Sequence, residues 1–392
     1  MVQDIKNVLT SRSSNKVDYL YFRNNDVLSG LEDLETIYTI KNFPVYMGAT
    51  DEKKEQDQFA DMCFKISKSS GMVQLNPLVD LNVVYQSSHN SGAIGQVWKD
   101  HHQALANFII KFGKNSVLEI GGYSGILANN CLNHNPHLDW TIIDPHVKPF
   151  DSKIKVLNSF FDHTFESDQQ YDVIVHSHLI EHVIDLNAFM KTCHDHLKDD
   201  GLMIFSFPNF YKFINDRHTN CLNFEHTFCL DEISLERLLS INSFKFVEKQ
   251  YFYEDHHIFC CVKKSEVELN SFPSRYEENK NIFLEYFDDL NIFIHKANDI
   301  LENEPVAFMF GGHVTSQFLI SMGLNQDLIT CLLDNDSKKH NRRLYGTNLM
   351  IKSPQILSNF ESPILILKNS LFDKEIKEQV LSINPNVRIL TL

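Results

Sequence analysis

Residues 117–144 read VLEIGGYSGILANNCLNHNPHLDWTIID and carry the strongest structural signal of the 392-residue chain. An apolar run, Val117–Ile120, is followed by the glycine-rich segment Gly121–Gly125 and then by apolar residues at helical spacing. A second apolar run ends on Asp144. This order predicts a buried strand, a tight turn, a helix and a second strand that ends on an acid. It is typical of a nucleotide-binding half of an α/β fold with a doubly wound sheet.

The glycine segment indicates which ligand this half would bind. Glycines let backbone N–H groups approach a ligand closely, and an acid such as Asp144 can accept both hydroxyls of a ribose. The dinucleotide pattern G-x-G-x-x-G would need glycine at positions 123 and 126, where Tyr123 and Ile126 stand. The pattern is instead E-x-G-x-x-x-G, beginning at Glu119. The segment therefore resembles motif I of class I S-adenosylmethionine (SAM) methyltransferases, with an NAD-type or purely structural turn as the alternative.

Composition and charge narrow the class of protein. The formal net charge is −15 and no basic tract is present, so we expect no nucleic-acid partner. No apolar run approaches the roughly 20 residues of a membrane-spanning helix, and no signal peptide is evident. We therefore expect a cytoplasmic protein without a membrane partner. The eight cysteines include no C-x-x-C pair, and the nineteen histidines are spread over loops and helix faces, which predicts no metal site.

Strands and helices alternate after Asp144. The apolar strand at 171–175 is followed by His176–His182, which includes His178 and Glu181, at the edge where open α/β sheets place ligands. A helix over 186–197 is expected to stop at Lys198–Gly201, before a strand at 202–206. The segment 210–231 is an insertion, and a helix at 232–239 and strands at 244–253 and 258–263 complete this region.

The pattern of the opening stretch restarts near the C-terminus. A strand at 306–310, the turn Gly311–His313, a helix at 314–322 and a strand at 328–333 before Asp334 predict a second Rossmann-like domain. A dimerisation lobe or a relic of duplication are the alternatives. We thus expect a small, loop-rich lobe at 1–98, a SAM-binding domain at 99–264 and a C-terminal domain at 275–392.

At this point the chain resembles one family, the three-domain SAM-dependent C-methyltransferases of nucleotide-linked 4-keto-deoxysugars. Five stretches carry the resemblance in addition to the glycine turn. They are Gly71–Leu75, Tyr85–Ser88, Leu179–His182, Glu225–Phe228, and Phe310–Gly312 with Asp334–Lys338.

The resemblance implies an acid–base site in the insertion. His226 would be the base that removes a proton next to the sugar ketone, and Glu225 would assist it. The family's tyrosine in this motif is missing, although Tyr85 could supply a hydroxyl, and His182 is a further candidate. The missing tyrosine leaves room for O-methylation, in which His226 would deprotonate a hydroxyl. A non-catalytic or NAD-linked relative is the remaining alternative.

The same resemblance implies two sets of ligand-binding residues. SAM would be bound by Glu119, Gly121, Gly122, Tyr123, Gly125, Asp144, Phe160 or Phe161, and His178. The nucleotide-sugar substrate would lie near Asn209, Gly312, His313, Lys338 and Arg342, with Arg343 adding positive charge for a diphosphate. A monomer or a homodimer is expected.

The N-terminal lobe departs from the family. Relatives carry a zinc ion whose last ligand pair is C-x-x-C, and here Ser67 and Ser70 occupy those positions. A serine hydroxyl does not ionise as a thiol does, so the resemblance implies a degenerate zinc lobe without its metal.

Overall fold

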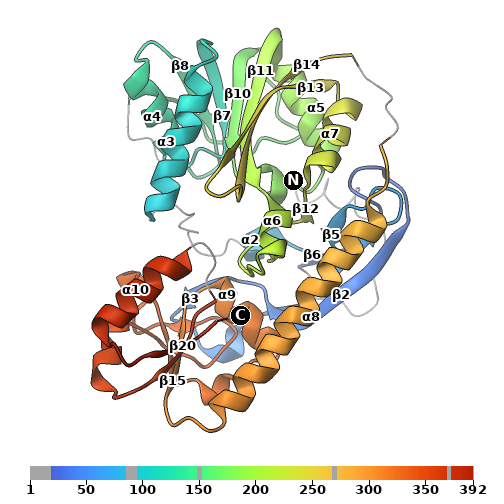
Figure 1. Ribbon diagram of the computed structural model, residues 1–392. Coiled ribbons are helices and arrows are strands. Elements are labelled where there is room, and N and C mark those ends of the chain that lie inside the picture. Colours follow the sequence, from blue (N-terminus) through green and yellow to red (C-terminus); the bar gives the residue numbers. More distant parts are fainter. Residues whose placement is uncertain (1–18, 85–94, 148–151, 267–271, 369–371, 392) are drawn as a thin grey trace.

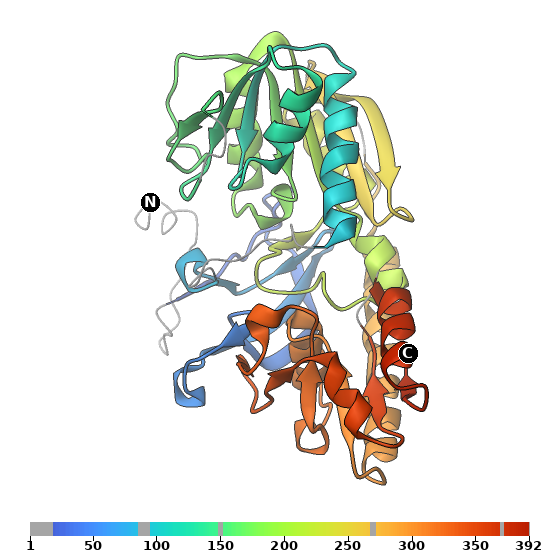
Figure 2. The same ribbon diagram turned by 90° about the vertical axis from the view of Figure 1, so that its left-hand side faces the viewer.

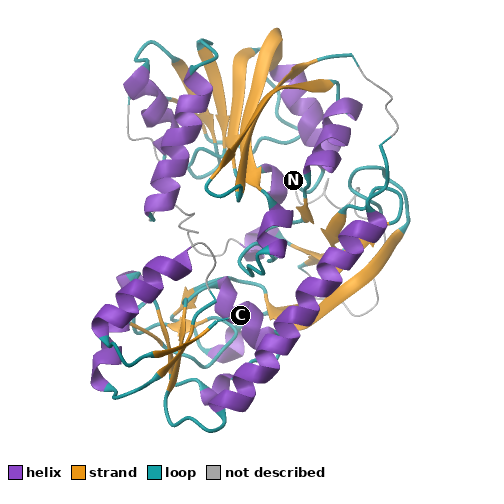
Figure 3. Cartoon of the chain, in the orientation of Figure 1, coloured by secondary structure: helices purple, strands orange, loops and turns teal. Residues whose placement is uncertain are grey.

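Three larger sheets form the framework of the computed structural model, which describes residues 19–84, 95–147, 152–266, 272–368 and 372–391. We call them the N-terminal sheet, with four strands, the central sheet, with seven, and the C-terminal sheet, with five. Figure 1 shows the central and C-terminal sheets at opposite ends of the molecule, with N-terminal strands and the long helix α8 between them. The chain is a mixed α/β protein with two Rossmann-like sheets, as predicted (Figure 3).

The central sheet has the strand order β13-β14-β11-β10-β7-β8-β9. The strands β7–β11 are parallel to one another, and β13 and β14 run antiparallel at one edge. The elements of this region are β7 (Ser116–Ile120), α4 (Ile126–His134), β8 (Asp139–Ile143), β9 (Lys155–Leu157), β10 (Tyr171–Ser177), α5 (Leu186–His196), β11 (Leu197–Pro208), α7 (Glu232–Ile241), β13 (Phe244–Phe252) and β14 (His257–Lys264).

Helices cover both faces of the central sheet. The helices α3 (Gln96–Ile110) and α4 pack on the face that carries Val173 and Val175 of β10. The opposite face, which carries Ile174, packs against α5 and α7. A strand buried on both faces is apolar at nearly every position, and this is why β7, β8 and β10 could be located from their apolar runs.

The connection from α5 to β11 differs from the prediction. The segment Lys198–Gly201, predicted as a stop between helix and strand, belongs to β11 itself. The pairing with β10 shifts register there, since Tyr171 pairs with Leu197 but Val173 pairs with Leu202. The extra residues form an irregularity on the exposed start of the strand, which apolar periodicity does not reveal.

The N-terminal sheet is more regular than the expected loop-rich lobe. Its order is β12-β5-β4-β2, from the strands β2 (Leu34–Pro44), β4 (Phe59–Ser67), β5 (Val73–Leu75) and β12 (Phe228–Cys229). Alternate residues of β4 are buried, among them Met62, Phe64 and Ile66. The strand β12 comes from the insertion at 210–231, so the central region of the chain contributes to this sheet.

Serine hydroxyls organise the turn after β4. The Ser67 hydroxyl accepts a hydrogen bond from the Ser70 N–H at 3.1 Å, and the Ser70 hydroxyl accepts one from the Met72 N–H at 3.1 Å. Gly71 then packs against α8, because an added Cβ would lie 2.6 Å from the carbonyl carbon of Arg275. Backbone hydrogen bonding thus holds the positions at which a zinc lobe would carry cysteines.

The C-terminal sheet is entirely parallel, with the order β18-β16-β15-β19-β20. Its elements include β15 (Ala307–Phe310), α9 (Val314–Ser321), β16 (Cys331–Leu333), β18 (Ile351–Lys352), β19 (Ile364–Ile366), α10 (Asp373–Ile383) and β20 (Arg388–Leu390). The strand predicted at 328–333 is shorter, because Gln326–Leu328 form a 3-10 helix. One face of this sheet shares a continuous apolar core with the N-terminal sheet and α8.

The helix α8 (Tyr276–Leu301) connects the sheets. Its Phe287 stacks on Tyr38 of β2 with ring centroids 3.7 Å apart, and its Tyr286 hydroxyl donates to the His218 carbonyl at 2.9 Å. Figure 2 shows the N-terminal strands between the two Rossmann-like regions. No helix within the described ranges is both long and apolar enough to cross a membrane.

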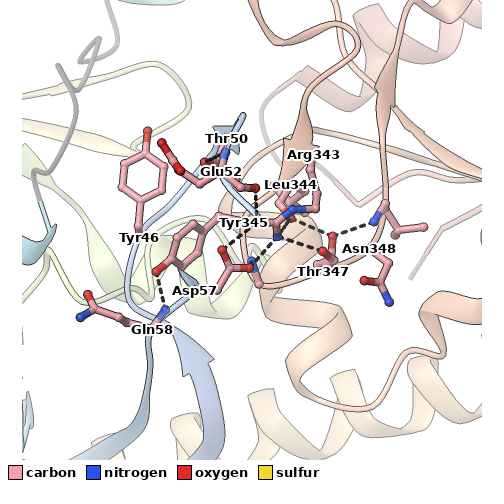
Figure 4. A network of polar contacts seen from close by, with 12 residues as sticks. Tyr46, Thr50, Glu52, Asp57, Gln58, Arg343, Leu344, Tyr345, Thr347 and Asn348 are labelled. Carbon is pink, nitrogen blue, oxygen red and sulfur yellow. Dashed lines mark hydrogen bonds and ion pairs between the residues drawn. The ribbon is translucent and has the colours of Figure 1, made fainter. Parts of the chain in front are cut away.

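A buried ion pair joins the C-terminal region to the N-terminal lobe (Figure 4). The Arg343 guanidinium donates to both carboxylate oxygens of Asp57, with an Nη2–Oδ1 distance of 2.8 Å, and also to the carbonyl of Glu52 at 2.9 Å. The Asp57 side chain is fully buried. The Arg343 donors thus hold two parts of the fold together, and the role of Arg343 toward a diphosphate stays a prediction.

Candidate active site

The glycine turn between β7 and α4 adopts backbone conformations that require glycine. Gly121 has a φ of 74° and Gly125 a φ of 66°, both in the left-handed region. The Gly121 N–H donates to the Ile143 carbonyl at 2.9 Å, which fixes the turn to the end of β8. A Cβ on Gly122 would lie 2.7 Å from the Glu119 carboxyl carbon. The glycine spacing thus permits close packing of the turn over the end of β7.

Asp144 lies at the end of β8, beside this turn. One carboxylate oxygen accepts the Tyr123 N–H at 3.1 Å and the other accepts the His146 N–H at 2.7 Å. A carboxylate can accept about four hydrogen bonds, so two backbone donors leave capacity for ribose hydroxyls. The residues present therefore fit the SAM-binding role that the sequence predicts for Asp144.

Glu119 is buried at the end of β7. Its carboxylate accepts a hydrogen bond from the Trp140 indole N–H at 2.8 Å. Burial raises the pKa of Glu119 to about 7, although the Trp140 donor acts in the opposite direction. The Glu119 side chain packs against the turn, next to the place that a Cβ on Gly122 would occupy.

A chain of polar contacts begins where β10 ends. His178 has a φ of 49°, which is unusual for a residue with a side chain and is common at functional sites. Its Nδ1 lies 3.2 Å from Oε1 of Glu181, and that oxygen lies 3.9 Å from Nε2 of His182. Glu181 is fully buried, and burial raises its pKa to about 7.

The predicted base, His226, lies next to this chain. The rings of His182 and His226 meet edge to face with centroids 4.9 Å apart. The loop is fixed at its end, because the Thr227 N–H donates to the Glu181 carbonyl at 2.9 Å. The structure therefore brings together Glu181, His182, Glu225 and His226, which the sequence could place only in two separate motifs.

The tautomer of His226 follows from its hydrogen bond. Nδ1 lies 2.6 Å from the Cys221 carbonyl oxygen, which can only accept, so Nδ1 carries the proton. The lone pair of the neutral ring is therefore on Nε2. Glu225 is buried, and burial raises its pKa to about 8, so this carboxyl group is largely protonated at neutral pH.

The aromatic candidates for the adenine site differ in exposure. Phe160 is 43% exposed and lies between β9 and β10. Phe161 packs against Phe165 and Phe189, with centroid distances of 5.2 and 6.0 Å. Phe160 is therefore the better placed of the two to contact a ligand. The candidate Tyr85 lies outside the described residues.

The predicted substrate residues of the C-terminal region are distributed around the second glycine turn. The Gly312 N–H donates to Asp334 at 2.9 Å, and His313 is the N-terminal residue before α9. Lys338 is exposed, and Arg342 forms a surface ion pair with Asp51 at 3.0 Å. The fifth, Asn209, is the residue before α6 (Phe210–Asn215), where its amide donates to the Asp255 carbonyl at 3.0 Å. Their binding roles remain predictions.

Sequence reasoning missed four residues that line or fix this region: Trp98, His101, His257 and Arg23. The first three meet His178, with ring centroids 5.0 to 5.1 Å from it. The buried Arg23 guanidinium donates to the Thr227 carbonyl at 2.8 Å and to the Ile184 carbonyl at 3.0 Å, which holds the His226 loop. The available signal was the position of His101 among the apolar residues of the segment that forms α3.

Comparisons with known proteins agree with the central sheet and its turn. Residues 94–249 match a family model described as a methyltransferase domain. Solved structures with similar folds include an S-adenosylmethionine-dependent methyltransferase from Clostridium acetobutylicum, at 16% identity over 44% of this chain and 94% of that chain, with a TM-score of 0.35. Another is the N-methyltransferase NodS from Bradyrhizobium japonicum, at 16% identity over 45% and 100%, with a TM-score of 0.34.

A third similar structure is the 1,6-didemethyltoxoflavin-N1-methyltransferase of Burkholderia thailandensis, at 15% identity over 51% of this chain and 98% of that chain, with a TM-score of 0.39. A comparison with curated proteins found no match. The matched domain and the glycine turn with Asp144 define a class I SAM methyltransferase domain. Residues 94–249 of the enzyme are therefore its methyltransferase domain, and the glycine turn with Asp144 fits S-adenosylmethionine as the cofactor rather than NAD.

Proposed function

We propose that the enzyme methylates a nucleotide-linked deoxy- or keto-sugar at carbon, with His226 as the base. The observation that carries this proposal is the hydrogen bond from His226 Nδ1 to the Cys221 carbonyl at 2.6 Å. It orients the ring and places the basic lone pair on Nε2. An imidazole that is held in one tautomer suits removal of a proton next to a ketone.

Glu225 and Asp144 have separate roles in this mechanism. His226 Nε2 takes the proton from the carbon beside the ketone, and the electron pair moves onto the ketone oxygen as an enolate. Glu225, which burial keeps largely protonated, can donate a hydrogen bond to negative charge that develops there. Asp144 and the glycine turn hold the cofactor, and bound SAM supplies an electrophilic methyl group for the enolate carbon.

The proposed division of the chain into three lobes would accommodate a large substrate. We keep the proposed lobes 1–98, 99–264 and 275–392, with the sugar at the Glu225–His226 loop. The nucleotide would lie toward Asn209, Gly312, His313, Lys338 and Arg342. The ion pair of Arg342 with Asp51 is at the surface, so it costs little to open for a phosphate. Resemblance to the sugar C-methyltransferases carries the choice of substrate class.

Deuterium exchange tests the proposed base. The enzyme is incubated with a TDP- or GDP-linked 4-keto-deoxysugar in deuterated water, and mass spectrometry follows exchange next to the ketone. We expect exchange with the wild type and a loss of about 10²–10⁴-fold in His226→Ala. Asp144→Ala is the matched control, because it impairs cofactor binding and leaves the base in place. Exchange that persists in His226→Ala would rule this residue out as the base.

O-methylation is the second candidate, favoured by the lack of the family tyrosine beside Glu225. In that reaction His226 Nε2 would deprotonate a sugar hydroxyl, and no ketone would be needed. A product methylated at oxygen, formed without exchange at carbon, would select this reaction over the first. His226→Ala would lower its rate as well, so the position of the methyl group decides between them.

A further inference from the structure

Three histidines from separate elements meet at the ligand-binding edge of the central sheet. His101 comes from α3, His178 follows β10, and His257 begins β14. The ring centroids are 5.1 Å apart for His101 and His178, 5.2 Å for His101 and His257, and 5.0 Å for His178 and His257. One ring nitrogen of each lies within 4.8 Å of those of the other two. The rings form a nearly equilateral triangle.

The burial of His101 calls for a ligand. Its side chain is 0% exposed, and neither ring nitrogen has a hydrogen-bond partner among the residues that the structure describes. A buried polar atom without a partner costs about 1–3 kcal/mol. His176 also has two such nitrogens, but its ring stacks on Phe205 and belongs to no histidine group. His101 differs because two other imidazoles each bring a ring nitrogen within 4.8 Å of one of its own.

The dimensions of the triangle match one metal ion. With metal–nitrogen bonds of about 2.0–2.1 Å, two histidine nitrogens on a tetrahedral Zn²⁺ lie about 3.3 Å apart. Nε2 of His178 and Nδ1 of His257 form a hydrogen bond to each other at 3.1 Å, which is close to that separation. The same bond length puts each imidazole centroid about 3.2 Å from the ion. A triangle with sides of 5.0–5.2 Å has its centre about 3 Å from each corner, so an ion slightly above the plane fits.

The surroundings provide the support that metal sites require. Oε1 of Glu181 lies 3.2 Å from Nδ1 of His178, and a carboxylate behind a histidine orients its other nitrogen toward a metal. Trp98 covers the three rings, with centroid distances of 5.3, 5.0 and 5.6 Å to His101, His178 and His257. Burial lowers the pKa of all three imidazoles, which keeps them in the neutral form that binds metals.

Two other groups of potential ligands are less suitable. In the group Glu181–His182–His226, the Nδ1 atom of His226 already donates a hydrogen bond to the Cys221 carbonyl. In the group Asp216–His218–His256, the two imidazoles stack nearly parallel, at an interplanar angle of 13°, and His256 pairs with Asp216 at 2.9 Å. Among the three groups in the described residues, the first triangle combines three imidazoles, a fully buried ligand with no hydrogen-bond partner and a carboxylate behind another ligand.

We propose that His101, His178 and His257 bind a divalent transition-metal ion of the Zn²⁺ class, with Glu181 as the residue that orients His178. Neutral nitrogen donors select such ions over Mg²⁺ and Ca²⁺, which prefer oxygen. Leu179, next to His178, also borders the glycine turn, since its Cδ1 would lie 3.4 Å from a Cβ on Gly121. The ion would therefore be held beside the cofactor-binding turn.

Metal binding by the untagged full-length protein tests this site. The protein is stripped with a chelator, titrated with Zn²⁺ and analysed by mass spectrometry of its metal content. Co²⁺ serves as the visible probe of a tetrahedral nitrogen site. We expect one ion per chain in the wild type and none in His101→Ala or His257→Ala. Glu181→Gln should weaken the affinity by about 10–100-fold, because it alters only the support of a ligand.

The matched control is His176→Phe, which removes a neighbouring buried imidazole outside the triangle and should bind Zn²⁺ as the wild type does. Circular dichroism shows whether each variant folds. A wild type without stoichiometric Zn²⁺, or without the Co²⁺ spectrum of nitrogen ligands, would overturn the proposal even if the alanine variants did not fold. Unchanged binding in folded His101→Ala and His257→Ala would overturn it as well. No sugar is needed, so the result is independent of the proposed substrate.

Discussion

The two Rossmann-like halves build nearly the same turn and use it differently. Gly121 donates to the carbonyl of Ile143, and Gly311 donates in the same way to Leu333, at 2.9 and 2.7 Å. The strand after each turn ends on an acid, Asp144 or Asp334. Each acid accepts one N–H from its turn and one from the residue two positions after itself. The backbone pattern alone therefore does not define a cofactor site.

The differences lie in the side chains around the acid. Lys339 pairs with Asp334 at 3.0 Å, which neutralises the second acid, whereas both described partners of Asp144 are backbone N–H groups. The first half also carries the buried Glu119, and the corresponding position of the second half is the apolar Met309. Charge around the acid, more than turn geometry, therefore separates the methyltransferase half from its structural counterpart.

The largest expected loss of stability comes from the contacts that attach each half to the N-terminal lobe. Arg343 pairs with the fully buried Asp57, whereas Arg23 binds the first half only through carbonyl oxygens. Arg343→Met should destabilise the protein by roughly 3–5 kcal/mol, because it leaves a buried carboxylate without its partner. Urea unfolding measures this loss. The double variant Arg343→Met with Asp57→Leu should recover part of it, and an undiminished loss would contradict the ion-pair explanation.

Glu119 has no acidic counterpart in the second half. It should make the free energy of unfolding depend on pH. Its folded pKa is raised to about 7 from 4.5, so the stabilising protonated form is complete below pH 4.5 and is lost as pH rises to about 7. The shift corresponds to about 3 kcal/mol. We expect the stability of Glu119→Gln to fall less between pH 5 and 7.5 than that of the wild type.

Thermal unfolding of the cofactor-free protein at several pH values makes this measurement. Met309→Leu is the control at the equivalent position of the second half, since it changes no charge. A Glu119→Gln variant whose melting temperature follows the wild type across the pH range would place the titrating group elsewhere.

Local patterns predicted the fold of both halves, and they indicated the Glu225–His226 pair of the candidate site. Strands such as β7 and β10 are buried on both faces, so their apolar runs are continuous, and Glu225 and His226 are neighbours in sequence. The N-terminal hairpin was underestimated because β2 is only partly buried and its polar and apolar residues mix. Buried and partly buried residues alternate along its partner strand β4. A short alternating run is weak evidence for a strand when no neighbouring strand is known.

Long-range pairs could not be predicted from single residues. Asp57 and Arg343 are 286 positions apart, and the sequence contains no signal that links them. His178 and His257 are 79 positions apart. They meet because β14 pairs with β11, which is the neighbour of β10 in the sheet. A histidine on an apolar surface has many possible neighbours, and the order of strands in the sheet selects among them.

The two acids themselves provide a test of which half binds the cofactor. Asp144→Ala should weaken the binding of S-adenosylhomocysteine by roughly 10–100-fold, the expected loss of a hydrogen-bonded charge. Asp334→Ala should leave this affinity unchanged, because Asp334 is already paired with Lys339. Isothermal titration measures both. Equal weakening in the two variants would show that the effect of Asp144→Ala is only structural.

The smallest expected difference concerns the second glycine of each turn. A Cβ on Gly122 would meet the Glu119 carboxyl carbon at 2.7 Å, and a Cβ on Gly312 would meet Cδ1 of Ile351 at 2.6 Å. Overpacking costs about 1–3 kcal/mol, and we expect Gly122→Ala to lie at the upper end of this range and Gly312→Ala at the lower.

The reason is the freedom of the group that each Cβ meets. Trp140 fixes the Glu119 carboxylate through a hydrogen bond of 2.8 Å, whereas the terminal methyl of Ile351 can turn about its last side-chain bond. Chemical denaturation of the two single variants measures the difference. If Gly312→Ala were the more damaging, close packing at the second turn would matter more to the fold than at the turn that binds SAM. The charge around the acids would then be the only remaining distinction between the halves.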